Sequence, residues 1–333
     1  MKQVLLLNDG KTGHFNQTLA VSYAVDKLYK TETDIAKIKV NRFTKYILRL
    51  MLNHTFGRNI LKHKSIYSFI NYFYSIDIPL KSYNIIISSG KDTSLLNAWL
   101  GLKNSSIYNI YIGNPKKLNH LLFDTLFSIL EHGFENEIIL NVAPTLPFHG
   151  NLDIFCEKFN LNKQLNYVTL LIGGDGSGYS YGENEYKNLI DFVNNTAKSI
   201  NWLVTTSRRT PIEIEKKLQQ NMKVSKFIAY HQNPQKVVAG FLMLSETVFV
   251  TQESASMINE AISFKKRVVT LYPRDKKEDD NYIAILKNFS QKRYIYMQDI
   301  NELANFSIKD IELKTLRQSS IDELVEKLKG VIG

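Results

Sequence analysis

The repeated order of apolar strand, polar turn and helix constrains this sequence more than any other feature. Val248–Thr251 is such an apolar run, Gln252–Ser256 is the polar turn after it, and Met257–Ile262 carries apolar residues at helical spacing. Continuous apolar strands are typical of parallel sheets, because helices bury both faces of such a sheet. The same order recurs along the chain, so the sequence predicts an α/β fold with parallel sheets.

The length of the chain predicts two domains, because 333 residues are too many for one ordinary core. Prolines and a glycine interrupt the pattern between Ala143 and Asn166, where we expect the connection between the domains and one short helix. The predicted parts are an N-terminal domain over 1–150, a C-terminal domain over 165–310, and a charged amphipathic helix in 311–333 that packs back on the N-terminal domain.

The composition is typical of a soluble globular protein, with 44% hydrophobic and 22% charged residues. No apolar run reaches the roughly 20 residues of a membrane-spanning helix. The chain enters an apolar strand at Val4, directly after Met1-Lys2-Gln3, without the long apolar region of a signal peptide. The single cysteine, Cys156, excludes an internal disulfide and a thiolate zinc cluster. We therefore expect a cytoplasmic protein.

The net charge of +10 is concentrated in one segment. Between Ile35 and Ile76 there is no acidic residue, and the segment carries eight lysines and arginines. Its first helix has an apolar stripe and a basic edge, and aromatic residues are frequent from Ile66 to Tyr74. The stripe consists of Phe43, Tyr46, Ile47, Leu50 and Met51, and the basic edge of Arg42, Lys45 and Arg49.

This pattern is what an interfacial membrane helix needs, so we predict that segment 35–76 contacts an anionic membrane surface. The protein would then be peripheral at the inner face of the membrane. The alternative is an ordinary core-facing helix with a solvated basic edge. The segment matches no nucleic-acid-binding module, and we expect no nucleic acid partner.

The first strand, Val4–Asn8, is followed by a polar loop with glycines at Gly10 and Gly13. The loop is neither a complete dinucleotide fingerprint nor a Walker loop. Small turn glycines allow a ligand to approach the backbone closely. Asp9 and His14 are both candidate proton acceptors in this loop, although Asp9 could simply cap the turn and His14 the next helix.

The second half begins with another apolar strand, Tyr167–Ile172, which runs into Gly173–Gly182 with five glycines in ten residues. Consecutive backbone N–H groups in such a loop can hold phosphate oxygens, and we expect Gly173, Gly174 and Ser177 to contribute to that role. A flexible connector between strand and helix is the alternative.

Two more strand ends in this half carry groups suited to an anion. The strand Trp202–Thr206 ends at Ser207, Arg208 and Arg209, and a guanidinium can bind phosphate bidentately. A surface turn would also accommodate these arginines.

The helix after Val248–Thr251 provides the third strand end of this kind. Ser254 or Ser256 is a natural N-cap, and the start of that helix would attract an anion. Glu260 lies a turn or two further along, in a suitable place to accept hydrogen bonds from the hydroxyls of a ribose. The structural alternative is a capped strand–helix unit with an exposed glutamate.

Together the polar strand ends resemble the family named for the plant mitochondrial-fission factor "elongated mitochondria", which is widespread in bacteria. The resemblance covers nearly the whole chain. The family typically has proline at the position of Thr12 and aspartate at that of Glu253, so no fixed role is assigned to Glu253. The motifs are Asp-Gly-Lys-x-Gly-His-x-x-Gln from Asp9, the glycine loop from Gly173, Thr-Ser-Arg-Arg-Thr-Pro from Thr206, and Val-Thr-x-x-Ser-x-Ser-Met-x-x-Glu-Ala from Val250.

The resemblance implies a GT-B glycosyltransferase-like protein, with two Rossmann-like domains facing a cleft and a nucleotide-sugar donor on the C-terminal domain. A related transferase adds N-acetylglucosamine to a lipid-linked muramyl peptide. It holds its nucleotide with a glycine loop, a hydroxyl-rich turn and a helix glutamate. The matching positions here are Gly173–Ser177, Ser254–Ser256 and Glu260. That enzyme also carries a histidine near its acceptor, as Gly13-His14 would here, and it sits on the membrane through a basic, apolar patch.

The first hypothesis is therefore a metal-independent transferase acting on a membrane-associated acceptor, either lipid-linked or a cell-envelope glycan. Asp9 or His14 would be the base, and the nucleotide-sugar is its donor substrate, with no obligate cofactor. No metal-binding pair of aspartates lies at a strand end, since Asp279-Asp280 falls in a charged loop. The donor-binding residues would be Gly10, Gly13, Gly173, Gly174, Ser177, Ser207, Arg208, Arg209, Ser254, Ser256 and Glu260.

Two other functions compete with this hypothesis. A non-catalytic recruitment protein could keep the cleft and use its surface, as the plant relative does in recruiting a fission GTPase. A nucleotide-sugar epimerase is less well supported, because no Tyr-x-x-x-Lys pair follows a cofactor fingerprint.

Overall fold

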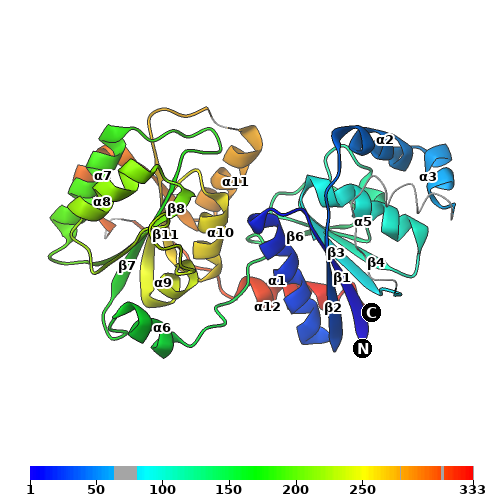
Figure 1. The fold of residues 1–333 in the computed structure, drawn as a ribbon, viewed down its shortest axis with the longest axis horizontal. Coiled ribbons are helices and arrows are strands. Elements are labelled where there is room, and N and C mark those ends of the chain that lie inside the picture. Colours follow the sequence, from blue (N-terminus) through cyan, green and yellow to red (C-terminus); the bar gives the residue numbers. More distant parts are fainter. Residues whose placement is uncertain (64–80, 278, 309–310, 333) are drawn as a thin grey trace. The chain divides into compact units, whose positions relative to one another are not determined.

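The chain forms two compact α/β units in a computed structural model that describes residues 1–63, 81–277, 279–308 and 311–332 (Figure 1). Unit 1 comprises Met1–Leu146 together with Ser320–Gly333, and unit 2 comprises Pro147–Ser319. Each unit has one six-stranded sheet in which neighbouring strands are parallel. The predicted fold class is therefore confirmed.

Unit 1 has the strand order β2-β1-β3-β4-β5-β6. Its strands are β1 (Lys2–Asn8), β2 (Thr31–Lys37), β3 (Ile85–Ser89), β4 (Tyr108–Ile112), β5 (Thr125–Ser128) and β6 (Glu137–Ile139). Its helices are α1 (Thr12–Leu28), α2 (Arg42–Asn53), α3 (Thr55–Leu61), α5 (Lys91–Lys103), the short η1 (His120–Leu122) and α12 (Ser320–Lys329).

The two faces of this sheet are covered by different helices, because successive residues of a strand point to opposite sides. Leu5 and Leu7 of β1 belong to the cluster that packs against α2, α3 and α5. Val4 and Leu6 belong to the cluster that packs against α1 and α12. All four side chains are almost fully buried, which explains the uninterrupted apolar run in the sequence.

Unit 2 has the strand order β12-β11-β10-β7-β8-β9. Its strands are β7 (Tyr167–Gly174), β8 (Asn201–Arg209), β9 (Lys226–Ile228), β10 (Ser245–Thr251), β11 (Arg267–Tyr272) and β12 (Ile295–Asp299). Its helices are α6 (Leu152–Phe159), α7 (Glu183–Thr196), α8 (Ile212–Asn221), α9 (Val238–Leu244), α10 (Ala255–Ser263), α11 (Asp280–Gln291) and η2 (Ile300–Asn305).

Both sheets contain a point at which the strand order reverses. In unit 1 the chain passes from β1 to β2 on one side and to β3 on the other. In unit 2 it passes from β7 to β8 on one side, and β10 pairs with the opposite side of β7. Ligands of open α/β sheets bind in the crevice at such a point, outside the carboxyl ends of the strands.

The end of the chain completes unit 1. Leu324 and Leu328 of α12 are fully buried in the same cluster as α1. Glu323 accepts hydrogen bonds from the backbone N–H (3.1 Å) and the side-chain Nδ2 (2.8 Å) of Asn141. Ser320 donates to the carbonyl of Thr145 at 3.0 Å. Apolar burial and these polar contacts fix α12 to unit 1.

Several local features of the structure differ from the expectations or add detail to them. The polar loop after β1 is shorter than expected, because α1 begins at Thr12 and includes His14 and Gln17. Before β5, Asn119 accepts a hydrogen bond from the N–H of Leu121 and caps the short turn η1. Ser254 occupies the N-cap position of α10 but makes no side-chain capping bond.

Helix α2 buries a different stripe from the one expected. Thr44, Leu48 and Leu52 are its buried side chains. Phe43 and Tyr46 of the predicted apolar stripe are 68% and 61% exposed, so the core-facing alternative is wrong for these residues. The aromatic residues expected from Ile66 to Tyr74 lie outside the described residues. No described helix is long and apolar enough to cross a membrane.

Candidate functional site

The polar residues after β1 form an Asp–His pair at the reversal point of unit 1. Asp9 follows β1 and His14 lies in the first turn of α1, and their Oδ2 and Nδ1 atoms are 2.8 Å apart. Asp9 is 1% exposed and His14 is 35% exposed at the side chain. A buried carboxylate bonded to Nδ1 favours the tautomer in which Nε2 is the basic nitrogen. In this geometry Asp9 can orient the imidazole ring of His14, whose side chain is the more exposed of the two.

Gly90, which the sequence did not single out as a site residue, makes room for this pair. It follows β3 with a φ of +96°, and a Cβ at this position would lie 2.1 Å from Nδ1 of His14. Ser89 before it donates to Oε1 of Gln17 at 2.8 Å. The predicted Gly10 also has a positive φ, of +79°, whereas a Cβ on Gly13 would have no atom within 4 Å, so Gly13 is open on that side. The contact between Gly90 and His14 forms only in the folded sheet, so the sequence alone did not indicate it.

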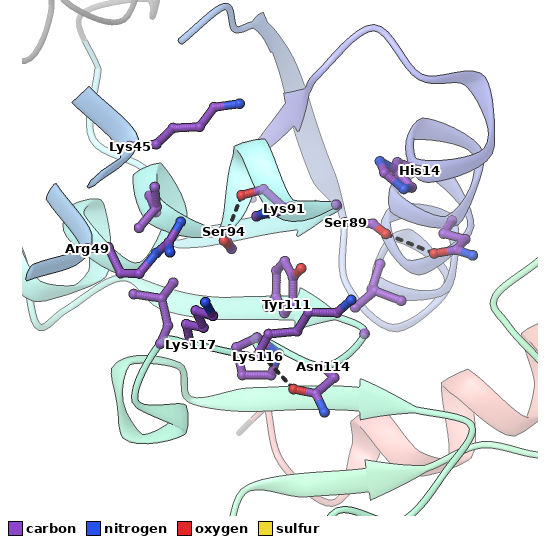
Figure 2. A pocket seen from close by; sticks show the side chains of 17 residues that line it. His14, Lys45, Arg49, Ser89, Lys91, Ser94, Tyr111, Asn114, Lys116 and Lys117 are labelled. Carbon is purple, nitrogen blue, oxygen red and sulfur yellow. Dashed lines mark hydrogen bonds between the residues drawn. The ribbon is translucent and has the colours of Figure 1, made fainter. Parts of the chain in front are cut away.

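His14 of this pair lines a pocket of about 430 Å³ in unit 1 (Figure 2). This volume lies in the range of pockets that bind small molecules, roughly 300–1,000 Å³. Tyr111 lies in its wall, and burial, with smaller contributions from Asp9 and Asp92, raises the pKa of the Tyr111 hydroxyl. The lining residues are His14, Gln17, Lys45, Arg49, Ser89, Gly90, Lys91, Ser94, Leu95, Tyr111, Ile112, Gly113, Asn114, Pro115, Lys116, Lys117 and Leu118.

In unit 2 the reversal point is organised around Glu253, which follows β10. Its side chain is fully buried, and Oε1 accepts a hydrogen bond from Nη2 of Arg209 at 3.0 Å. Its other oxygen, Oε2, is buried without a hydrogen-bond partner within the described chain. Burial is the main influence on the pKa of Glu253 and raises it to about 8, against the opposing effect of Arg209. Sequence reasoning assigned this residue no role.

The glycines at the end of β7 make room for this ion pair. A Cβ on Gly173 would lie 1.5 Å from Oε1 of Glu253, and one on Gly176 would lie 2.3 Å from Nη1 of Arg209. Gly174 has a φ of +104° and pairs with Arg209 across the sheet. The N–H of Gly173 already donates to the hydroxyl of Thr251 at 2.7 Å. Internal packing therefore accounts for glycines that we had expected to face a ligand.

The rest of the glycine loop is a tight hairpin and not a flexible connector. Gly176 and Tyr179 exchange backbone hydrogen bonds of 3.0 and 2.9 Å. Ser177 and Gly178 between them have φ values of +50° and +86°, the combination of a type I′ turn. Ser177 also donates to the carbonyl of Glu253 at 2.9 Å, which ties the hairpin to the ion pair.

The remaining predicted residues of unit 2 differ in their accessibility. Ser207 donates to the carbonyl of Gly173, so its hydroxyl is used within the protein. Arg208 and Ser256 are exposed, and Ser254 is buried. Glu260 is partly exposed in α10, and burial raises its pKa to about 7. Among the described residues, no three His, Cys, Asp or Glu side chains are grouped so that they could hold a metal ion.

Comparison with known families agrees with these motifs. The model of the family described as "Mitochondrial fission ELM1" matches residues 12–312. The chain belongs to this family. No curated protein matches the sequence.

Solved structures share the fold of this ELM1-family chain at low sequence identity. The UDP-GlcNAc 2-epimerase of Methanocaldococcus jannaschii is 13% identical with a TM-score of 0.55, and 99% of this chain and 100% of that chain are covered. Acinetobacter baumannii MurG is 9% identical with a TM-score of 0.54 and the same coverage. The Staphylococcus aureus MnaA–UDP structure is 12% identical with a TM-score of 0.53, covering 99% of this chain and 91% of that one. At these identities the likeness shows a shared GT-B-like fold.

The buried Glu253 makes the stability of the protein depend on pH. Its pKa is raised from 4.5 in the unfolded chain to about 8, so the folded protein binds this proton more tightly. The resulting contribution of Glu253 to the free energy of unfolding is fully present below about pH 4.5 and is lost as the pH rises through about 8. We expect the free energy of unfolding of the wild type, relative to that of Glu253→Gln, to fall between pH 5 and pH 9 in urea titrations.

A matched control for this experiment is Glu246→Gln. Glu246 is exposed on the same strand, β10, so its replacement removes one carboxylate without touching the buried pair. The stability of this control relative to the wild type should stay nearly constant over the same pH range. If the stability difference between the wild type and Glu253→Gln is also constant over this pH range, the raised pKa of Glu253 is contradicted.

Proposed function

We propose that the protein is a glycosyltransferase that moves a sugar from a nucleotide-sugar donor to a membrane-associated acceptor. The observation that carries this proposal is the Asp9–His14 pair, whose histidine lines a ligand-sized pocket. A hydroxyl group that attacks an anomeric carbon must lose its proton, and a histidine oriented by a buried carboxylate is suited to accept it. The GT-B-like fold agrees with this chemistry.

In the proposed reaction Asp9 accepts the hydrogen bond from Nδ1–H of His14, and Nε2 takes the proton of the acceptor hydroxyl. The imidazolium that forms is stabilised by the buried carboxylate 2.8 Å away. The acceptor oxygen forms the new bond to the anomeric carbon, and the bond between that carbon and the nucleotide diphosphate breaks. The diphosphate leaves with the bonding electron pair.

Unit 2 would hold the donor at the start of α10. This helix has no side-chain cap, so its first N–H groups remain available for a diphosphate. Arg208, at the end of β8, and Ser256, shortly after β10, are exposed. Glu260 could accept hydrogen bonds from ribose hydroxyls. Two of the similar structures are named for UDP or a UDP-sugar, which supports uridine nucleotides as the first donors to test.

We also propose that helices α2 and α3 contact the membrane. Each of these consecutive helices carries exposed large side chains, and Arg58 of α3 and Lys62 after it supply positive charge. Aromatic and aliphatic side chains enter the interface between headgroups and acyl chains, while basic residues attract anionic lipids. The exposed apolar residues are Phe43, Tyr46, Leu50, Phe56 and Ile60.

Calorimetry with nucleoside diphosphates tests the donor site. We expect Glu260→Ala to weaken binding by about 1–3 kcal/mol, the effect of losing a hydrogen bond to a charged group. Because hydroxyl donors favour the ionised carboxylate, and the pKa of Glu260 is about 7, wild-type affinity should rise between pH 6 and pH 8. Glu260→Gln should remove that rise. No binding in the uridine, cytidine, guanosine and adenosine series would contradict the proposal.

Transfer itself is tested with a labelled nucleotide-sugar and a membrane fraction from the source organism. The label should move to the lipid fraction, and His14→Ala should lower the rate by about 10²–10⁴-fold, the usual effect of losing a general base. Nucleotide binding should not change, because His14 belongs to unit 1 and Glu260 to unit 2. An epimerised sugar still attached to its nucleotide would indicate an epimerase instead.

Membrane contact is tested by co-sedimentation with anionic vesicles. The double variant Phe43→Ser, Phe56→Ser should lower the bound fraction by roughly tenfold in partition coefficient, because two large apolar side chains no longer enter the interface. Ile154→Ser is the control, since Ile154 is equally exposed, at 65%, but lies on α6 of unit 2. If the control loses as much binding as the double variant, the α2–α3 surface is not the contact.

A further inference from the structure

The pocket beside His14 has a lining of one charge sign. Lys45, Arg49, Lys91, Lys116 and Lys117 all line it, and no aspartate or glutamate does. In Figure 2 Arg49 and Lys117 lie at one end of the pocket and His14 at the other. These cations come from α2, from the start of α5 and from the turn after β4, so the fold gathers them from three separate segments.

Most of this charge is not compensated within the described part of the protein. Lys45 forms an ion pair with Asp92, at 2.5 Å between Nζ and Oδ1. Arg49, Lys91, Lys116 and Lys117 have no carboxylate partner among the described residues. Like charges within a Debye length, about 8–10 Å, repel one another, and a concave wall strengthens their common field. Such a pocket is suited to an anion, whose binding would relieve the repulsion.

The lysine at position 116 is held there against its backbone preference. Lys116 has a φ of +56°, in the left-handed region that favours glycine and asparagine. The side chain of Asn114 accepts a hydrogen bond from the N–H of Lys116 at 2.6 Å and stabilises this turn. Asparagine or glycine adopts this left-handed backbone conformation at a lower conformational energy than lysine. The charge at position 116 can therefore be removed by substitution without loss of stability.

The start of α5 adds to the positive potential of the same pocket. Its N-cap residue, Gly90, has no side chain that could cap the helix, and Gly90, Lys91 and Ser94 all line the pocket. The free N–H groups and the dipole of a 13-residue helix favour negative charge at this end. His14 lies in the same wall, so an anion bound here would lie in the same pocket as the proposed base.

We propose that this pocket recognises a phosphate or diphosphate group of the acceptor and so positions the acceptor hydroxyl near His14. This proposal rests on the proposed function and narrows the acceptor to phosphorylated molecules. Several convergent cations match a group with two or more negative charges better than a neutral glycan. The pocket volume of about 430 Å³ leaves room for a sugar beside the phosphate.

Helix α2 links the pocket to the proposed membrane surface. Lys45 and Arg49 of α2 line the pocket. Phe43 and Tyr46 of the same helix are exposed. A phosphate in the pocket would thus lie against a helix that also presents apolar side chains, an arrangement suited to a phosphate attached to a lipid.

Inorganic diphosphate is the probe for the first test, with affinity measured by calorimetry on the full chain. Lys116→Asn and Arg49→Gln should each weaken binding by about tenfold, because each removes a charged donor. Lys116→Asn should leave the melting temperature unchanged or higher, because asparagine tolerates the left-handed backbone. The controls are Lys39→Asn and Arg42→Gln, which replace exposed cations of unit 1 outside the pocket and should change affinity less than twofold.

A second test identifies the source of the phosphate. Neutral phospholipid vesicles doped with a long-chain polyprenyl diphosphate should retain the wild type more strongly than undoped vesicles, and Lys116→Asn should lose the difference. If a water-soluble sugar phosphate binds as tightly as diphosphate while doped vesicles give no gain, the acceptor is a free phosphorylated sugar. Both outcomes support a phosphate site.

Two results would overturn the proposal. Diphosphate that does not bind, or that binds wild type, Lys116→Asn and Arg49→Gln equally, would show that the pocket is not a phosphate site. Nucleotide binding measured on the same variants distinguishes failure of the phosphate-site proposal from failure of the proposed function. Variants that lose diphosphate binding but keep nucleotide binding support the phosphate site. If the wild type binds diphosphate in the pocket but binds no nucleotide, the phosphate site is supported and the proposed transferase function is contradicted.

Discussion

The reversal of strand order in each parallel sheet is the constraint on which both candidate sites depend. Where the order reverses, the connections leave the neighbouring strands toward opposite faces, and the carboxyl ends of these strands remain uncovered. In unit 1 this brings Asp9 after β1 next to Gly90 after β3. In unit 2 it brings Gly173 of β7 next to Glu253 after β10. The places where functional groups can meet are thus set by topology before any side chain is chosen.

The position of Glu253 changes the interpretation of the glycine loop Gly173–Gly182. A glycine at the end of a strand can make room for a ligand, or it can make room for another part of the protein. Gly173 makes room for another part of the protein, because the carboxylate of Glu253 fills the space that a Cβ would need. The N–H of Gly173 is also bonded to Thr251, so it is not free for a phosphate. The groups of unit 2 that remain accessible to the proposed donor are therefore Arg208 and the start of α10, which has no side-chain cap.

The sequence was most informative where structure is determined locally. The predicted strand Tyr167–Ile172 lies in β7, and the short helix predicted between Ala143 and Asn166 is α6, because continuous apolar residues and an asparagine cap act over a few neighbours. Strand order and the ion pair between Arg209 and Glu253 could not be predicted, because the partners are 44 residues apart and meet only in the folded sheet. The identity of the orienting group in the Asp9–His14 pair likewise needed the position of His14 on α1.

Helix α2 shows why apolar spacing alone cannot tell which face of a helix is buried. Its sequence contains two offset stripes, and the shorter one packs on the core. The three faces of the helix are Thr44, Leu48 and Leu52 toward the core, Lys45 and Arg49 toward the pocket, and Phe43, Tyr46 and Leu50 toward the exterior.

A helix with one buried, one basic and one exposed apolar face satisfies more constraints than folding requires. Burial of the first stripe is sufficient to hold α2 on unit 1, so neither the cations in the pocket nor the exposed aromatic side chains are explained by stability. Exposed aromatic groups are unfavourable in water, and uncompensated cations repel one another. Both costs would be offset by one class of ligand, an anionic group carried on an apolar chain. The two features of α2 are therefore better explained together than separately.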